Sequence, residues 1–375
     1  MRVAIVTPLY PTPQYPWHGT FIRDQARSIA LAGAEVRVFH ADVRSVRTMH
    51  RAMVRGPDVS PAPGDPVVER RLGWTLGALT IPTAMRLAGE RLARAASSGP
   101  PPDVVHGHFS FGGGDAALAM ARRFACPLVV TEHSSEFSRG LVRGRRARSI
   151  RLVAEAANEL VAVSDDLARR FEEAVGRSVE IIPNVVDVDN FPPRTSHPSG
   201  QPLRIVAVGS LNPKKGFDIL IEALAGLQAE PWHATIVGQG PEAGRLAALA
   251  RRAGMNDRIK LVGSLPRSQI RALLEGASLF VAPSRHETFG VAIAEALSVG
   301  VPVVATPGGP SSFVRLPFGV IAQADPAAIR RAIEAMVASP PGFDPRASHE
   351  RVRAAFAPEI VGQQLMGHYR RLAAT

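Results

Sequence analysis

Short apolar runs alternate with longer segments of helical periodicity along this chain. Residues 2–7 form the first apolar run and end at Pro8, as expected of a strand buried on both faces. A helical stretch at 21–31 ends at Gly33, and a second apolar run follows at 35–39. The order strand, helix, strand predicts a βαβ unit with parallel strands.

The same alternation continues through the first half of the chain. It predicts strands at 103–108, 127–131 and 161–164, and helices at 116–124 and 150–160. Strands separated by helices form parallel sheets that are covered on both faces. The first half is therefore predicted to be a doubly wound α/β domain.

The pattern starts again after a loop-like segment at 183–202. Residues 203–213 align with residues 1–11, and both read as a first strand that runs into a loop. The predicted strands of the second half are 204–208, 233–237, 259–262, 279–282 and 302–305. The predicted helices are 218–227, 241–253, 267–275 and 291–297. We expect two Rossmann-like doubly wound parallel-sheet domains, 1–193 and 194–357, facing across a cleft, with a C-terminal helix at about 358–375 that packs back on the first.

Composition narrows the class of protein. The chain has 375 residues, of which 46% are hydrophobic and 21% charged, values typical of a globular protein and not of a disordered or integral membrane protein. The single cysteine, Cys126, cannot form an internal disulfide, which favours a reducing compartment. The first apolar run is too short for a signal peptide. These features predict a cytoplasmic location.

Positive charge is concentrated in arginine-rich segments. The net formal charge is +11. Between Phe137 and Glu155 the arginines are Arg139, Arg143, Arg145, Arg146, Arg148 and Arg151, and a second set, spaced for one helical face, is Arg44, Arg47, Arg51 and Arg55. Such surfaces attract phosphorylated ligands, anionic lipids or nucleic acid, although a solvated arginine-rich surface explains them equally well. With only 6% aromatic residues to stack on bases, we expect no nucleic acid; peripheral contact with the inner face of an anionic membrane stays a hypothesis.

One loop concentrates the few lysines of the chain. It runs from Gly209 to Gly216 and contains Lys214 and Lys215, two of only three lysines in the sequence. A lysine ammonium is a compact charge suited to a phosphate oxygen, and glycines allow close backbone approach. The spacing is not that of a Walker A loop. Exposed lysines in a turn before a helix are the alternative explanation.

A second segment places two glutamates around a helix start. Glu287 precedes a helix predicted to start near Gly290, and Glu295 lies on that helix. The N-terminus of a helix offers free N–H groups and a positive dipole end to a phosphate, and carboxylates accept hydrogen bonds from sugar hydroxyls. Glutamates near a helix start also occur by chance.

Together the two segments resemble the family 4 glycosyltransferases, retaining enzymes of GT-B fold that use nucleotide sugars. The resemblance covers nearly the whole chain. Its other matching positions are Gly19, Asp103 to His106, Thr131 to His133, Pro183 to Asp187, Gly238-x-Gly240-Pro241, the Gly263-Ser264-Leu265-Pro266 segment and Gly308-Gly309.

The resemblance implies a role for each matching residue. Lys215 would contact the diphosphate, Glu287 the transferred sugar and Glu295 the ribose of the donor. The backbone amides of Thr288, Phe289 and Gly290 would bind the phosphate, Gly19 would let the first-domain loop approach it, and His133 would face the sugar from across the cleft. The implied donor-binding set also contains Ser210, Lys214, Gly238 and Leu265.

This chain departs from the family pattern at two positions. Many members have arginine where Ser210 stands, and many have glutamate shortly after the diglycine, where this chain has Pro310, Ser311 and Ser312. The first departure leaves more of the phosphate charge to Lys215 and Lys214.

We therefore expect a retaining hexosyl- or N-acetylhexosaminyltransferase that needs no metal or other cofactor. Its acceptor would be a glycan, a lipid-linked saccharide or a small-molecule aglycone in cell-envelope or natural-product biosynthesis. The alternatives are a GT-B nucleotide-sugar epimerase or hydrolase, and a basic protein that binds anionic surfaces. His106, His108 and His133 could also share a metal, but polar residues lining a ligand site at the strand ends are the favoured interpretation.

Overall fold

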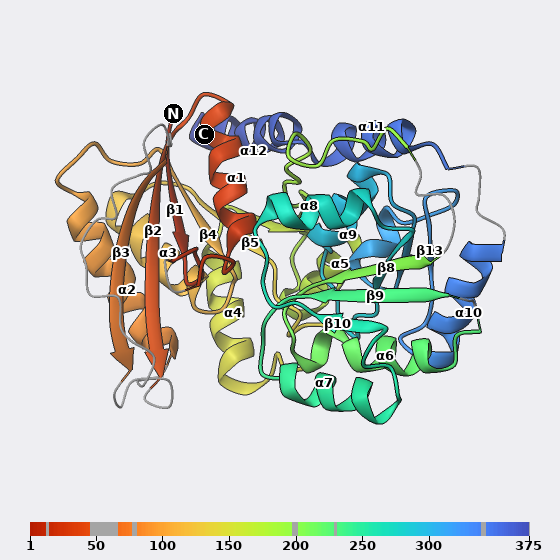
Figure 1. The fold of residues 1–375 in the computed structure, drawn as a ribbon. Helices are drawn as coiled ribbons and strands as arrows, with labels where there is room; N and C mark the ends of the chain where they lie inside the picture. Colours follow the sequence, from red (N-terminus) through yellow and green to blue (C-terminus); the bar gives the residue numbers. More distant parts are fainter. Residues whose placement is uncertain are drawn as a thin grey trace. The chain divides into compact units, whose positions relative to one another are not determined.

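The computed structural model describes residues 1–12, 15–45, 67–76, 81–196, 202–228, 231–338 and 343–374. The chain divides into two compact units (Figure 1). The first unit contains Met1–Val185 and Pro358–Thr375, and the second contains Val186–Ala357. The division lies a few residues before the expected one, so the expected linker at Pro192 and Pro193 belongs to the second unit.

The first unit is built on a seven-stranded parallel sheet with the strand order β3-β2-β1-β4-β5-β6-β7. The strands are β1 Arg2–Thr7, β2 Glu35–Ser45, β3 Val67–Leu76, β4 Val104–His108, β5 Leu128–Glu132, β6 Glu159–Ala162 and β7 Glu180–Ile181. The prediction of a helix through Leu160 is wrong at its end, because Glu159 and Leu160 already pair with β5.

Six helices belong to the first unit: α1 Thr20–Leu31, α2 Ile81–Ala96, α3 Gly113–Phe124, α4 Gly144–Ala156, α5 Asp165–Val175 and α12 Pro358–Ala373. Alternate residues of β1, Val3 and Ile5, share one apolar core with side chains of α1 and α12. A Cβ at Gly362 would lie 2.3 Å from the Ser28 carbonyl oxygen, so a glycine allows α12 to lie directly on α1. The C-terminal helix thus completes the first unit.

The alternation of β4 separates its side chains onto two faces. A Cβ at Gly107 would meet the Cβ of Ala117 on α3 at 2.7 Å, so this face of the strand is closed by a helix in near-backbone contact. His106 and His108 therefore point to the opposite face, where α12 lies.

The second unit is a six-stranded parallel sheet of order β10-β9-β8-β11-β12-β13. Its strands are β8 Leu203–Val208, β9 Trp232–Val237, β10 Ile259–Leu261, β11 Leu279–Ala282, β12 Val303–Ala305 and β13 Gly319–Ile321. Its helices are α6 Phe217–Ala225, α7 Ala243–Arg252, α8 Arg267–Glu275, α9 Val291–Val299, α10 Pro326–Ala338 and α11 Pro345–Phe356. The strand order 3-2-1-4-5-6 is that of a Rossmann fold. The predicted fold class, two doubly wound parallel α/β sheets, is confirmed.

Two expectations about charged and apolar segments can be compared with the fold. Arg44 lies in β2, so the prediction of one helical face is wrong there, and Arg47, Arg51 and Arg55 lie outside the described residues. Among the residues that the structure describes, no helix has both the length and the apolar character needed to cross a bilayer.

Candidate active site

Two loops of the second unit meet at the carboxyl edge of its sheet. Strands β8 and β11 are hydrogen-bonded neighbours, yet the chain leaves them in opposite directions, since β9 lies beyond β8 and β12 beyond β11. Such a switch point opens a crevice outside the strand ends, where ligands of doubly wound sheets bind. The loop after β8 carries Lys215, and the loop after β11 carries Glu287.

A glycine brings these loops into contact. Lys215 ends a short 3₁₀ turn, Pro213–Lys215, and Gly216 follows with φ of 66°. A Cβ at Gly216 would lie 2.0 Å from the carbonyl oxygen of Pro283, which no side chain tolerates. Across this contact the Lys215 ammonium donates to Oε2 of Glu287 at 2.5 Å.

The Lys215–Glu287 ion pair is largely enclosed. Their side chains are 22% and 11% exposed, and the Ser284 hydroxyl donates to the same Glu287 oxygen at 3.2 Å. Burial alone would raise the pKa of Glu287, but the charges of Lys215 and Lys214 and the hydrogen bonds lower it below its ordinary value. Glu287 is therefore a carboxylate at neutral pH, held by a cation.

The start of α9 adds a positive dipole end next to this ion pair. Gly290 precedes the helix with φ of 92°, and no side chain caps it. Phe289 is buried against Phe313 and Phe356, with ring centroids 5.3 and 5.1 Å away, which anchors the loop. A Cβ at Gly309 would lie 2.1 Å from the Thr288 carbonyl oxygen, so the second glycine of the diglycine supports the same loop. The arrangement suits an anion.

Glu295 is buried on α9 beside a cation that the sequence analysis missed. Its Oε1 lies 3.8 Å from Nε of Arg267, whose guanidinium also donates to Asp187 at 3.2 Å. Arg267 directly follows the Gly263-to-Pro266 segment at the start of α8. That position, one residue beyond a matched motif, was the available clue.

The remaining predicted donor residues lie in neighbouring loops of this edge. Ser210 is exposed and Lys214 half-buried in the loop after β8, and Leu265 is half-buried between β10 and α8. Gly238 ends β9, where a Cβ would lie 1.9 Å from the Gly209 carbonyl oxygen. The structure thus gathers all the predicted second-unit residues on the loops and the helix that follow β8, β9, β10 and β11.

In the first unit, Gly19 and His133 lie at the corresponding edge of the sheet. Gly19 precedes α1 with φ of 64°, and a Cβ there would lie 2.5 Å from the Leu9 carbonyl oxygen. His133 follows β5, and its ring lies 4.8 Å from that of Phe21 in the first turn of α1. The loops after β1 and β5 are therefore joined through aromatic contacts.

His133 belongs to a row of buried histidines. Its Nε2 is 2.9 Å from Nδ1 of His108, and the ring of His108 stacks on that of His106 with centroids 4.5 Å apart. His106 is in turn hydrogen-bonded through Nδ1 to the Tyr369 hydroxyl at 2.6 Å and through Nε2 to Thr131 at 2.7 Å. The row connects the end of β5 to α12.

Burial keeps this row neutral. Desolvation lowers the pKa of His106 and of His133 to about 3 and places that of His108 well below its ordinary value. Both nitrogens of His133 are enclosed, with Nε2 against His108. Tyr369 and Thr131 occupy both nitrogens of His106, and within the described ranges no group of His, Cys, Asp or Glu is arranged to hold a metal.

Glu132 organises the loops around His133, a role that the sequence analysis did not assign. Its buried carboxylate accepts from the backbone N–H groups of Ser110 at 3.0 Å, His133 at 2.9 Å and Ser134 at 2.7 Å, and also from the Ser110 hydroxyl. Burial raises the pKa of Glu132, although these donors oppose the rise. The side chain thus joins the loops after β4 and β5.

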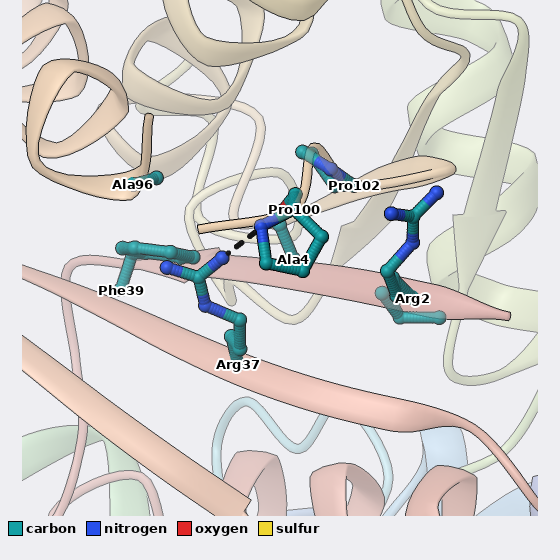
Figure 2. Close-up of a pocket in the computed structure, with 8 residues that line it drawn as sticks. Arg2, Ala4, Arg37, Phe39, Ala96, Pro100 and Pro102 are labelled. Carbon is teal, nitrogen blue, oxygen red and sulfur yellow. Dashed lines mark hydrogen bonds between the residues drawn. The ribbon is translucent and has the colours of Figure 1, made fainter. Parts of the chain in front are cut away.

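A small pocket in the first unit lies away from these loops (Figure 2). It is lined by Arg2, Ala4, Arg37, Phe39 and Pro100, among others, and the Arg37 guanidinium donates to the Pro100 carbonyl oxygen at 3.3 Å. Arg2 opens β1, so the pocket is at the amino edge of the sheet, opposite to Gly19 and His133. It is not part of the candidate site.

Comparison with known proteins bears on the whole chain. The family "Glycosyltransferase Family 4" matches residues 18–190, and the family "Glycosyl transferases group 1" matches residues 189–353. The D-inositol 3-phosphate glycosyltransferase of Xylanimonas cellulosilytica is 30% identical over 77% of this chain and 75% of that protein. A phosphatidylinositol N-acetylglucosaminyltransferase component from Arabidopsis thaliana is 29% identical over 70% of this chain, which spans 60% of that protein's length.

Solved structures share the fold. Sucrose-phosphate synthase from Thermosynechococcus elongatus superimposes with a TM-score of 0.82 and 19% identity over 100% of this chain and 99% of that one. Anabaena HepE, solved in complex with UDP and glucose, gives 0.76 and 18% over 99% and 100%. The two family matches run without a gap from residue 18 to residue 353, and with the 30% identical relative they show that this chain belongs to the group 1, family 4 glycosyltransferases.

Proposed function

We propose that this glycosyltransferase takes its sugar from a nucleoside diphosphate sugar bound at the carboxyl edge of the second unit. The observation that carries the proposal is the enclosed Lys215–Glu287 ion pair beside the uncapped start of α9. A cation, a helix N-terminus and a carboxylate together suit a diphosphate joined to a hydroxylated sugar. The presence of UDP and glucose in Anabaena HepE, a protein of the same fold, supports this choice.

The proposed mechanism follows from where charge develops. When the bond between the sugar C1 and the phosphate oxygen breaks, negative charge grows on the leaving diphosphate and positive charge on the sugar ring. Lys215 and the N–H groups at the start of α9 would meet the phosphate, while Glu287 would hold sugar hydroxyls. Because these groups are already fixed by Gly216, Phe289 and Gly309, little reorganisation is needed.

Donor binding would exchange the partners of the ion pair. Lys215 now contacts Glu287 at 2.5 Å and would turn to the diphosphate, which frees the Glu287 oxygens for the sugar. Glu295 would accept hydrogen bonds from the ribose hydroxyls, with Arg267 holding the carboxylate in its ionised form. Lys214, whose charge reaches Glu287, would supply the second cation where Ser210 replaces the arginine of many members.

Retention of configuration is proposed from the family resemblance. The acceptor oxygen would attack C1 from the face that the diphosphate leaves, so that the new C1–O bond forms as the old one breaks. The acceptor proton would pass to an oxygen of the departing phosphate. The acceptor would be a glycan, a lipid-linked saccharide or a small aglycone, the sugar would be a hexose or N-acetylhexosamine, and no metal or organic cofactor would take part.

The test combines ligand binding with two variants and their matched controls. UDP, GDP, ADP and dTDP are first compared for their effect on the melting temperature, since a ligand of the native state raises it. With the nucleotide so identified, Lys215→Ala and Glu287→Gln should each lower kcat by about 100- to 1000-fold. Lys260→Ala and Glu275→Gln remove an exposed lysine and a solvent-accessible, ion-paired glutamate from the same unit and should leave turnover unchanged.

Clear results would decide against the proposal. Wild-type turnover in both site variants would remove Lys215 and Glu287 from the mechanism. Release of free sugar, or conversion of the donor sugar without any acceptor, would favour a hydrolase or an epimerase. Activity that disappears with EDTA and returns with a divalent cation would contradict the proposal that no metal takes part.

We also propose peripheral contact with an anionic membrane through α4. Arg145, Arg148 and Leu152 follow the spacing of one helical face, opposite to the buried Ile150 and Val153. Leu152 is 51% exposed, and Leu141 just before the helix is 42% exposed. Exposed leucines between arginines are typical of helices that lie in a lipid interface.

Sedimentation with vesicles tests this contact. The protein should bind vesicles containing anionic phosphatidylglycerol, and not neutral phosphatidylcholine vesicles, and the double substitution Arg145→Gln/Arg148→Gln should weaken that binding at least tenfold. Unchanged binding of the double variant, or equal binding to neutral vesicles, would contradict the assignment to α4. Transfer to a water-soluble acceptor should be the same in the variant and the wild type.

A further inference from the structure

We propose that Arg285 is a positioning residue that fixes the loop after β11 to the loop after β8 and so sets Glu287 against Lys215. The inference rests on the proposed function, because it assigns these two residues to the donor site. Lys215 and Glu287 are 72 positions apart in the chain, and they belong to loops that leave the sheet in opposite directions. Their contact therefore needs a separate connection between the loops.

The first part of that connection is made by the backbone. The N–H of Arg285 donates to the carbonyl oxygen of Lys214 at 2.8 Å, and the N–H of His286 approaches the same oxygen at 3.3 Å. Lys214 and His286 are each the immediate neighbour of a member of the ion pair. The two hydrogen bonds thus join the loops one residue away from the proposed chemistry.

The side chain of Arg285 adds a second and stronger connection. Its Nη1 donates to the Pro213 carbonyl oxygen at 3.0 Å and to Oδ1 of Asp218 at 2.7 Å, and its Nη2 donates to Oδ2 of Asp218 at 3.0 Å. Pro213 begins the 3₁₀ turn that ends at Lys215, and Asp218 lies in the first turn of α6. The planar guanidinium therefore spans both ends of the segment that carries Lys215.

The electrostatics agree with a committed ion pair. Hydrogen bonding to Asp218 raises the pKa of Arg285; burial alone would raise the pKa of Asp218, but its arginine partners lower it. Arg245 on α7 also approaches Asp218, at 3.3 Å, and is paired with Glu242. Since the guanidinium of Arg285 is occupied by Asp218 and Pro213, we assign it to positioning and not to contact with the donor.

The pair is too exposed to act mainly through stability. The side chain of Arg285 is 39% exposed, and solvent-exposed ion pairs stabilise proteins only slightly. A misplacement of reacting groups by about 1 Å, in contrast, is sufficient to lower a rate by about 100-fold. Loss of Arg285 should therefore affect turnover much more than folding.

Three variants test the inference. Arg285→Met should lower kcat by about 50- to 100-fold while the KM for the nucleotide sugar changes less than threefold, because Lys215 and the start of α9 remain to bind the diphosphate. Arg285→Lys keeps the charge without the fork and should recover only part of kcat. Arg245→Met removes the other arginine beside Asp218, leaves the loop after β11 untouched, and should keep kcat within twofold.

Hydrogen exchange supplies a measurement that does not depend on turnover. In Arg285→Met the backbone amides of residues 283–290 should exchange at least tenfold faster, and in Arg245→Met they should exchange as in the wild type. A kcat within twofold of wild type in Arg285→Met, or an equal loss in Arg245→Met, would overturn the inference. If the wild-type enzyme transfers no sugar, the proposed function fails, and the exchange rates alone then decide whether Arg285 fixes the loop.

Discussion

The carboxyl edges of the two sheets are built alike but carry different chemistry. In the first unit the polar side chains there are buried and neutral, and His106, His108 and His133 lie in a row with their pKa values lowered by burial. In the second unit the ion pair of Lys215 and Glu287 occupies the equivalent place beside the start of α9.

The difference shows two ways of fixing loops at the end of a parallel sheet. Neutral hydrogen bonds and stacked rings hold the first edge, and they leave no charge that would repel or attract a ligand. The second edge is held by ion pairs and by glycines in backbone contact, such as Gly216 and Gly309. A charged edge of this kind is suited to an anionic ligand, whereas a neutral edge is suited to an uncharged one.

The largest expected effect is acid destabilisation through the histidine row. Because the pKa of His106 and of His133 is about 3 in the folded protein and near 6.5 in the unfolded chain, the unfolded chain binds more protons between these values. Stability is complete above pH 6.5 and falls as the pH is lowered, by about 2 kcal/mol for each of the two histidines at pH 5.

Urea unfolding at several pH values measures this loss. The variant His106→Phe removes one titrating group, so the slope of unfolding free energy against pH between 6 and 5 should decrease by about 1.4 kcal/mol per pH unit. An exposed histidine provides the control, because His233→Phe should leave the slope unchanged. An identical slope in His106→Phe and the wild type would show that the row is not kept neutral.

The second effect concerns the glycine contacts of the charged edge. A methyl group at Gly309 would lie 2.1 Å from the Thr288 carbonyl oxygen, so Gly309→Ala should push the loop before α9 out of place. We expect kcat to fall by about 100-fold, equivalent to about 2.7 kcal/mol. In the control Gly276→Ala the nearest atoms are 3.8 Å away, and steady-state kinetics should detect no change.

The third effect is proton uptake when a nucleotide diphosphate binds. If Lys215 turns to the diphosphate, burial is no longer offset at Glu287 and the pKa of Glu287 rises. Binding near pH 5 should then take up part of a proton, which titration calorimetry detects as a different enthalpy in buffers of different ionisation enthalpy. Glu287→Gln should show less uptake than the wild type, and equal uptake would mean that the ion pair does not open.

The smallest effect separates helix propensity from the site. Gly244 lies in the first turn of α7, and a methyl group there meets no atom within 4 Å. Gly244→Ala should raise the free energy of unfolding by about 0.5 kcal/mol and leave kcat unchanged. A loss of activity would mean that glycines of the second unit act on the site from beyond its direct contacts.

The sequence was sufficient for the fold class and for most of the elements. Alternation of apolar runs and helical segments predicted β1, α1, β8, α8 and β11 within a residue or two of their bounds. It missed α5, although Ser164 caps that helix and Asp165 and Asp166 follow in its first turn, because the predicted strand extended to Ser164. The end of β6 and the start of α5 share that residue, and periodicity does not resolve such a boundary.

For the candidate site, the sequence identified the residue types and tertiary structure decided their partners. The lysine-bearing loop, the two glutamates and the glycines around them are visible as local spacing. That Arg285 reaches Asp218 and that Glu132 gathers the amides after β4 and β5 is not, because these contacts join segments that only the strand order makes neighbours. The burial that keeps His106 and His133 neutral likewise depends on α12 returning from the end of the chain, since desolvation is a property of the packed interior and not of local sequence.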